Sequence, residues 1–412
     1  MVALRSRWYR NIRRQDKILV MVFKRILHPV GQGAFFTEQF LDDNQDTLLY
    51  NVVYDCGSKS SSIQKQMERS IRNILHDKKK IDVLFLSHFD DDHVNYVMFL
   101  KLHGHLDGTR IFIPMLEAEE WLEIEPYYNN YHLILSLNEQ RVGGTKVIRV
   151  RFDEEEKREP DNRREETIEE ITDDEISSGT ILKPNIPIVG PIWRYTPFNV
   201  RFNSLINEFK AQLSQNGLDY SQLTIRKYVL KHMGELKKIY QGLGKKPTGG
   251  TAINLNSLLV MSYPVDPDLC KVYGNRTTCS MYFYEWFRWN ERITKYFLTM
   301  NNLYAGSCLY TGDTSANDPV VWSKIEGMIS QCLKENRRLT LMQVPHHGSK
   351  HSYDVKLVNS NKYYAGFTNY DPYYWQKIFD DNLPMKFAMK KKPLILVTRD
   401  YGSQFEEYWK LA

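Results

Sequence analysis

Short apolar runs and one segment of helical periodicity alternate over the first part of the chain. Residues 47–54 and the run KIDVLFLS at 80–87 have the length and apolar content of strands, and a run as apolar as the second suits a strand covered on both faces. Between them, SSSIQKQMERSIRNILH predicts a helix with a serine cap and one apolar face, formed by Ile63, Met67, Ile71, Ile74 and Leu75. Strand, helix and strand in this order predict an α/β fold.

Strand patterning returns later in the chain, at TAINLNSLLVMS (251–262) and LYAGSCLYTGD (303–313). The stretch SMYFYEWFRWNERITKYF between them alternates aromatic residues with Arg and Lys. Such a stretch either stacks nucleic-acid bases or fills a core or an interface. We interpret residues 18–115 and 251–412 as the two halves of one core, with an aromatic insertion near 262–303.

The region from residue 116 to residue 250 interrupts this pattern. Its charged tract, RFDEEEKREPDNRREETIEEITDDEISS, lacks apolar periodicity and favours an exposed or mobile segment, whereas its later part looks helical. We interpret residues 116–250 as a largely helical, charged insertion that caps the core and offers a surface to a large substrate or a protein partner. Residues 1–17 form a basic tail, either solvated or in contact with nucleic acid or a membrane surface.

Composition and charge narrow the class of protein. The chain of 412 residues is 42% hydrophobic and 13% aromatic, which supports a large core and excludes a wholly disordered protein. The longest apolar run, Ile18–Phe23, is too short to span a bilayer, and no secretory leader is visible. Five scattered cysteines are typical of reduced thiols in a cytoplasmic protein. A net charge of +5 permits nucleic acid as a partner without requiring it.

Metal-binding side chains are concentrated in LSHFDDDHVNYV, residues 86–97. The spacing His-x-Asp-x-Asp-His lets one turn direct several ligands to one point, and it is formed by His88, Asp90, Asp92 and His93. Imidazole and carboxylate groups are ligands of zinc, manganese and iron. Three other strand ends carry the same residue types, and strand ends are where sites of α/β sheets are assembled. These residues are Asp55 in YDCGS, Asp313 in LYTGDTS, and His346 and His347 in VPHHGS.

Taken in this order, the four stretches resemble the metallo-β-lactamase fold hydrolases, and among them the hydrolase domain of bacterial competence-type DNA-uptake proteins. HPVGQGAFF resembles the opening strand and glycine turn of that subgroup, and NLNSLLV and YYAGFTNY resemble later strands. The matched segments span residues 22–403, without counterparts for the two insertions. The resemblance implies a four-layer αββα sandwich with a metal cleft at the sheet edges.

The resemblance also implies a ligand set for two divalent ions, zinc or manganese. His88 and Asp90 would hold the first ion, Asp92 and His93 the second, and Asp313 would bridge them. One of His346 and His347 would complete the second site. Because neighbouring side chains of an extended strand point to opposite faces, we expect only one of the pair to be a ligand. Asp55 would support the site by hydrogen bonding.

Two departures from the family pattern concern the first ion. Asp90 stands where the commoner pattern has His, and the additional histidine that many relatives supply before the TGD strand is missing. The histidines in that interval are expected on the surface or in packing roles; they are His103, His105, His132 and His232. The first ion is therefore expected to be short of ligands, and either weakly held or better suited to manganese.

The function implied is metal-dependent hydrolysis by a metal-activated hydroxide that Asp92 or Asp313 orients. We expect a phosphodiesterase or nuclease acting on nucleic acid or a nucleotide. His347, together with Ser349, Lys350 and His351, would contact the phosphate or protonate the leaving oxygen, unless the last two lie in a solvated loop. The alternatives are hydrolysis of a small ester, thioester or lactone, and a regulatory or binding protein with a degenerate site.

Overall fold

The computed structural model is a mixed α/β fold with two multi-stranded sheets and several helices. It describes residues 21–44, 47–75, 80–115, 125–139, 144–152, 164–187, 189–200, 203–242, 257–277, 303–317, 319–333, 337–371 and 379–411. The predicted basic tail at 1–17 and residues 278–302 of the predicted aromatic insertion, with its whole aromatic stretch, lie outside the described residues.

The first sheet has nine strands in the order β12-β17-β1-β2-β3-β4-β5-β6-β8. Its strands from β3 to β8 run parallel, and the others pair antiparallel. The bounds are β1 Met21–Leu27, β2 Phe35–Leu41, β3 Leu48–Cys56, β4 Val83–Phe85, β5 Arg110–Pro114, β6 Lys146–Val150, β8 Glu175–Ile176, β12 Cys270–Thr277 and β17 Phe405–Leu411.

The second sheet has eight strands in the order β16-β15-β14-β13-β11-β10-β9-β7. Strands β13 to β16 are parallel, and β9, β10, β11 and β13 pair antiparallel. The bounds are β7 Glu165–Thr167, β9 Ile181–Lys183, β10 Trp193–Asn199, β11 Leu258–Pro264, β13 Leu303–Tyr310, β14 Arg338–Gln343, β15 Tyr363–Asn369 and β16 Leu394–Val397.

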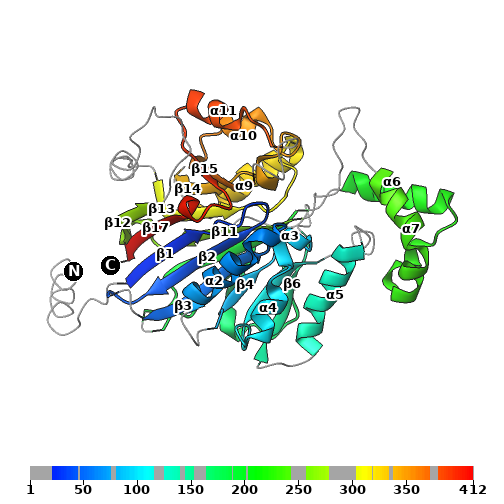
Figure 1. Ribbon diagram of the computed structural model, residues 1–412, viewed down its shortest axis with the longest axis horizontal. Helices are drawn as coiled ribbons and strands as arrows, with labels where there is room; N and C mark the ends of the chain where they lie inside the picture. Colours follow the sequence, from blue (N-terminus) through cyan, green and yellow to red (C-terminus); the bar gives the residue numbers. More distant parts are fainter. Residues whose placement is uncertain are drawn as a thin grey trace, which may run out of the picture.

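Three apolar clusters show how helices and sheets pack (Figure 1). One lies between the sheets and includes Phe36 and Val260, one from each sheet. A second joins the first sheet to α2 Gln64–Leu75, α4 Val97–Leu102 and α5 Glu125–Glu139. A third joins the second sheet to α9 Pro319–Cys332, α10 Val355–Asn359 and α11 Leu383–Met389. The helix predicted after residue 60 is confirmed as α2, with Met67 and Ile71 buried.

A buried polar network also joins the sheets. Arg25 of β1 is fully buried, lies 2.8 Å from Oε1 of Glu38, contacts Glu407, and donates to Gly306 O. The other carboxylate oxygen of Glu38 accepts hydrogen bonds from Tyr195 and Ser262 of the second sheet, at 2.8 and 2.7 Å. One buried cation therefore faces two carboxylates and offsets part of their charge inside the core, where an unpaired charge is costly.

The middle of the chain differs from the predicted insertion at 116–250. Strands β6 and β8 extend the first sheet, and β10 pairs with β11 along seven residues of the second. The charged tract was expected to be exposed or mobile, but its described residues 164–178 pack on the fold: Ile168 is fully buried, and Glu169 accepts a 2.5 Å hydrogen bond from Tyr50. Likewise, the predicted aromatic insertion begins and ends within strands, β11 and β13.

Besides α5, which packs on the first sheet, the predicted insertion contains the helix pair α6 Asn203–Gln215 and α7 Arg226–Gly242. These helices enclose a small apolar core of their own that includes Phe209, Leu213 and Leu236. In Figure 1 the pair projects away from the two sheets, beyond α3 (Asp91–Val94) and α5. Among the described residues, no helix has the length and apolar content needed to cross a membrane.

Asp82, immediately before β4, offers a test of buried charge. Its carboxylate accepts a 2.8 Å hydrogen bond from Asn51 N, and burial raises its pKa from 3.8 to about 6. The Asp82 carboxyl therefore binds its proton more tightly in the folded protein than in the unfolded chain. Above pH 6, where the carboxyl is ionised, its burial lowers the free energy of unfolding. Asp82→Asn is expected to stabilise the fold by about 1–3 kcal/mol at pH 8 and little below pH 4. Urea unfolding at both pH values measures this, and a gain independent of pH would contradict it.

Candidate metal centre

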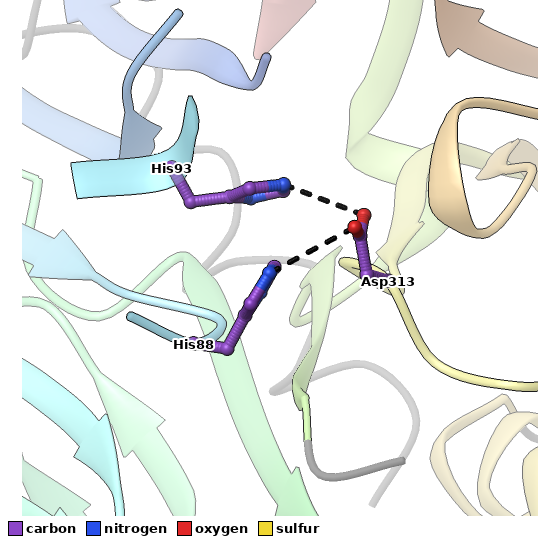
Figure 2. Close-up of side chains that lie close together, drawn as sticks. All are labelled: His88, His93 and Asp313. Atoms are coloured by element: carbon purple, nitrogen blue, oxygen red, sulfur yellow. Dashed lines mark ion pairs between the residues drawn. The ribbon is translucent and has the colours of Figure 1, made fainter. Parts of the chain in front are cut away.

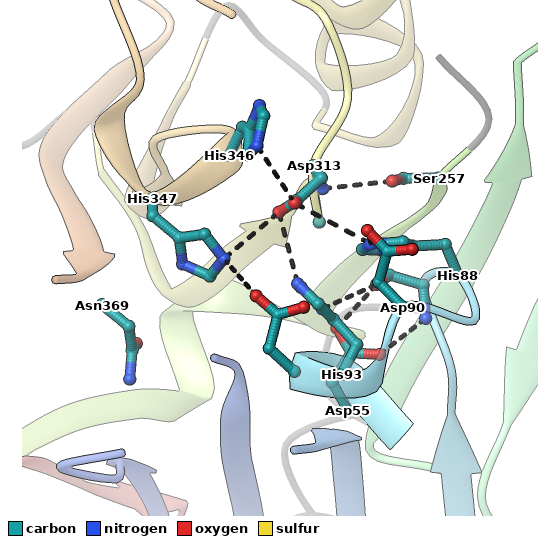
Figure 3. A network of polar contacts seen from close by, with 12 residues as sticks. Asp55, His88, Asp90, His93, Ser257, Asp313, His346, His347 and Asn369 are labelled. Atoms are coloured by element: carbon teal, nitrogen blue, oxygen red, sulfur yellow. Dashed lines mark hydrogen bonds and ion pairs between the residues drawn. The ribbon is translucent and has the colours of Figure 1, made fainter. Parts of the chain in front are cut away.

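The parallel strands of both sheets end at the same cluster of His and Asp side chains. Asp55 ends β3 and His88 follows β4 in the first sheet, whereas Asp313 follows β13 and His346 follows β14 in the second. Asp90, Asp92 and His93 come from the turn and the short helix α3 that begins directly after β4. The structure thus brings together the residues predicted as metal ligands and the supporting Asp55; Figure 3 labels all of them except Asp92.

Asp313 lies at the centre, and its two oxygens face different histidines. Oδ1 is 3.3 Å from Nε2 of His93 and 3.7 Å from Nε2 of His347. Oδ2 is 3.8 Å from Nε2 of His88 and 3.6 Å from Nε2 of His346. Figure 2 shows His88 and His93 both directed at this carboxylate. A carboxylate placed in this way can bridge two sets of ligands.

Each histidine set has a further carboxylate beside it. Asp92 Oδ2 lies 3.4 Å from Nε2 of His347, on the side of Asp313 Oδ1. Asp90 Oδ2 lies 3.6 Å from Nε2 of His88, on the side of Asp313 Oδ2. Asp92 is buried, whereas the Asp90 side chain is 23% exposed.

The histidine pair lies on a turn, not on the extended strand that the sequence suggested. Residues 346–348 form one 3-10 turn, in which His346 and His347 have φ of 50° and 53°. In this left-handed conformation both rings face Asp313, so the backbone does not direct the two side chains to opposite faces, on which the expectation of a single ligand rested. Each left-handed non-glycine residue costs about 1 kcal/mol or more.

Positive φ is concentrated at this site. Four non-glycine residues of the described chain have it, and three are Asp55, His346 and His347, with Lys391 the fourth. The surrounding contacts hold them: Ser87 N and Oγ both donate to Asp55, at 2.7 and 2.6 Å, and Ser352 Oγ lies 2.7 Å from Nδ1 of His346. Backbone strain retained in this way is typical of functional sites.

Asp55 orients the ring of His93. Its Oδ2 lies 2.8 Å from Nδ1 of His93, which leaves Nε2 directed at Asp313. The Ser87 hydroxyl similarly lies 2.8 Å from Nδ1 of His88. A hydrogen bond to one ring nitrogen fixes the orientation in which the other binds a metal. Asp55 therefore has the supporting place expected for it, and Ser87 is a second supporting residue that the sequence did not reveal.

Gly57 allows β3 and α3 to approach closely. A Cβ atom at this position would lie 2.4 Å from the backbone of Asp92 and His93. The amide of Gly57 donates to Ala34 O, and the amide of Ala34 donates to Asp92 O. The glycine turn, the end of β3 and the start of α3 are thereby fixed to one another, which places Asp92 and His93.

Electrostatic coupling keeps the carboxylates ionised. Burial by itself raises the pKa of Asp313, but the nearby rings of His346, His93 and His347 hold it well below its usual range. Burial lowers the pKa of His93, yet Asp313 and Asp55 outweigh it and raise that pKa well above its usual value. The pKa of Asp92 is also held low, because the effects of His347 and His93 exceed that of burial. Ionised carboxylates are the form that binds metals.

The spacing and the unsatisfied atoms fit metal coordination. The paired N and O atoms around Asp313 are 3.3–3.8 Å apart, and ligand atoms about 2.1 Å from one tetrahedral ion lie roughly 3.4 Å apart. Nε2 of His88 and Nε2 of His93 are buried without a hydrogen-bond partner in the described structure. The site can therefore hold a metal ion, and its two compact groups are His88, His93 and Asp313, and Asp92, His93 and His347.

Lys59 and Gln32 also reach the site, although the sequence did not single them out. Nζ of Lys59 lies 3.2 Å from Oδ1 of Asp92, and Nε2 of Gln32 donates to Oδ2 of Asp92 at 3.2 Å. Burial lowers the pKa of Lys59, but Asp92 and Asp90 more than offset this and raise it. Gln32 lies within GQG, and Lys59 directly follows DCGS. Their places in these two glycine turns were the available sequence signal for a position near the site.

Other histidines lie elsewhere. Nδ1 of His103 is 2.8 Å from Phe99 O, and Nδ1 of His232 is 3.0 Å from Glu235, as expected for packing and surface roles. His105 and His132 belong to neither compact group. Of the residues after the pair, Ser349 is buried and its amide donates to His346 O, so it stabilises the turn, whereas Lys350 is exposed.

Neither the family models nor the curated proteins compared with this sequence give a match. The chemistry open to the site therefore follows from its own donor atoms, their spacing and their charges.

Proposed function

We propose that the protein is a metal-dependent hydrolase of the metallo-β-lactamase fold. The arrangement of the apolar clusters supports a four-layer αββα sandwich, with sheets inside and helices outside. The observation that carries the functional proposal is the placement of Asp313, whose two oxygens lie 3.3–3.8 Å from four imidazole nitrogens. Such spacing suits a carboxylate shared by two ions of zinc or manganese.

The residues divide between two proposed ion sites. His93, His347 and Asp92 would hold one ion beside Oδ1 of Asp313. His88, Asp90 and His346 would hold the other beside Oδ2. His346 thereby supplies the histidine that the sequence seemed to lack, because the turn directs it toward His88's side of the carboxylate. Both ions then have comparable ligand sets, which removes the reason to expect one to be much weaker.

Bound divalent ions would lower the pKa of a coordinated water to about 7 and polarise the bond to be cleaved. The protein's own side chains position the ligands. Asp55 and Ser87 orient the rings of His93 and His88, and Asp313 spaces the two sets. Asp90 is the most exposed carboxylate of the set, with 23% of its side chain exposed, so its side of the cluster faces the surface.

The proposed substrate is a phosphodiester, in nucleic acid or in a nucleotide. The Lys59 ammonium beside the carboxylates favours an anionic substrate over the neutral esters and lactones that the same fold can hydrolyse. The backbone strain at Asp55, His346 and His347 weighs against a degenerate site in a regulatory protein. Such strain lowers stability, and without a function nothing would offset that loss.

The direct test combines metal analysis with hydrolysis of bis-p-nitrophenyl phosphate. We expect purified protein loaded with zinc or manganese to retain up to two ions per chain and to hydrolyse the diester. Chelation should abolish hydrolysis, and returning the ion should restore it. Protein that binds neither ion would refute the proposal, and protein that binds metal but cleaves neither phosphodiesters nor esters would favour a binding role.

His346→Asn tests the proposed ligand sets. Asn tolerates the left-handed backbone but is too short to place a nitrogen where the imidazole lies. We expect the affinity for one of the two ions to fall at least about tenfold while the other ion stays bound. A chelator titration followed by metal analysis measures this, with His103→Asn as the matched control. Unchanged retention of both ions would show that His346 is not a ligand.

A further inference from the structure

Lys59 places one positive charge at the edge of the carboxylate cluster. Its Nζ lies 3.2 Å from Oδ1 of Asp92, and its side chain is 33% exposed, whereas that of Asp92 is 2% exposed. The ammonium thus spans from a buried carboxylate to the surface of the site. Asp90 and Asp313 add to the negative charge around it.

The backbone that carries Lys59 is fixed over α3. The amide of Lys59 donates to Gln32 O at 2.8 Å. The preceding residue, Ser58, donates through its amide to Oδ1 of Asn95 at 3.1 Å and accepts from Nδ2 of Asn95 at 2.6 Å. Its hydroxyl donates to Val30 O at 2.8 Å. These hydrogen bonds fix the backbone at Ser58 and Lys59, so the long side chain of Lys59 is the part of this residue that can change position.

The contact between Lys59 and Asp92 competes with metal binding. Asp92 is one of the three residues in a compact group of possible ligands. A divalent ion that takes this carboxylate neutralises the charge that attracts the ammonium, and it also repels the ammonium. Gln32 is uncharged and donates to the other oxygen of Asp92, so this neutral contact can persist. A bound ion would therefore free the Lys59 ammonium from Asp92 and leave it at the edge of the site.

We propose that Lys59 forms an anion-binding subsite, which takes a negatively charged, non-bridging oxygen of the substrate's phosphodiester group. This inference rests on the proposed function and deepens it, because it assigns the substrate class to one residue. A lysine is suited to this role, since its compact charge on a flexible stem binds phosphate without a fixed geometry. A neutral ester offers no charge to Lys59 and gains nothing from it.

The test compares Lys59→Met with Lys59→Arg, and with Lys65→Met on the exposed surface of α2 as the matched control. Zinc-loaded proteins are titrated with inorganic phosphate by calorimetry. Their kcat and KM are measured on bis-p-nitrophenyl phosphate, an anion, and on p-nitrophenyl acetate, a neutral ester. Metal content is measured for every variant, because Lys59 contacts a proposed ligand.

We expect Lys59→Met to weaken phosphate binding and raise KM for the diester about tenfold each, with kcat for the neutral ester and metal content unchanged. Lys59→Arg should restore most of the phosphate affinity. Equal losses on both substrates, unchanged phosphate binding, or a fall in metal content would each overturn the subsite. Wild-type protein that binds phosphate through Lys59 but hydrolyses neither substrate would refute the proposed function alone, whereas active protein indifferent to Lys59 would refute the subsite alone.

Discussion

Asp313→Asn is expected to lower the hydrolysis of bis-p-nitrophenyl phosphate by about a thousandfold, the largest effect of any single change in the site. The amide keeps the shape of the carboxylate but carries no charge, and only one of its two terminal atoms can bind a metal. Because Oδ1 and Oδ2 each face two histidines, one set of ligands would meet an NH2 group. Metal analysis should show fewer bound ions than in the wild-type protein.

The control for this variant is Asp173→Asn, at an exposed position between the edge strands β7 and β8. It should leave both hydrolysis and metal content unchanged. Circular dichroism of the two variants separates loss of metal from loss of fold. Full metal content and activity in Asp313→Asn would mean that the central carboxylate is structural, and the two proposed ion sites would lose their common element.

Arg25→Met is expected to lower the free energy of unfolding by about 3–5 kcal/mol, the largest stability effect in the core. The change leaves Glu38 and Glu407 buried without their cation. Burial already raises the pKa of Glu407 even with Arg25 beside it, so the isolated carboxylate would bind a proton at higher pH still. Urea unfolding at pH 7 measures the loss.

A triple variant shows whether uncompensated charge is the cause. Removing all three charges, with Arg25→Met, Glu38→Gln and Glu407→Gln, should recover much of the lost stability, since apolar or neutral replacement of a whole buried ion group is often close to neutral. If the triple variant were less stable than Arg25→Met alone, hydrogen bonding by Glu38 to Tyr195 and Ser262 would be the dominant contribution.

The candidate site could be predicted from sequence because its residues follow parallel strands. Strand ends carry Asp55, His88, Asp313 and His346, and the edges of the two sheets bring them together. What the sequence could not give was the backbone conformation at 346 and 347. Extended geometry separates neighbouring side chains, whereas the left-handed turn directs both rings to Asp313. The additional ligand that we propose, His346, is thus adjacent to the other histidine of the pair.

Contacts between distant loops were equally hidden. Lys59 and Gln32 meet Asp92 only because Gly57 allows β3 to lie against α3. Neither residue type is a metal ligand, so a search for ligands passes over them. Their role depends on tertiary packing, which no local pattern records.

The strands in the middle of the chain were missed for another reason. Strands β7, β8 and β9 have two or three residues each, too few to show alternation. β7 and β8 lie at sheet edges, where charged residues such as Glu165 and Glu175 are favoured because they discourage edge-to-edge association. For this reason the acidic tract gave no sign, in the sequence, of the edge strands β7 and β8. By contrast, β10 is seven residues long and mostly buried. Its sequence contains TPF, and this segment interrupts the apolar pattern that would otherwise indicate a strand.

The placement of Asp313 at the junction of the two sheets has a consequence for biosynthesis. His88 and His93 belong to the first sheet and leave the ribosome early, whereas Asp313, His346 and His347 follow strands of the second sheet and leave it late. A nascent chain that ends before His347 cannot assemble the full set of proposed ligands, however well its first strands have paired. If the cluster binds metal as proposed, full metal uptake would follow the packing of β13 and β14 beside the strands that carry Asp55 and His88, and a chain that ends before them would lack the proposed site.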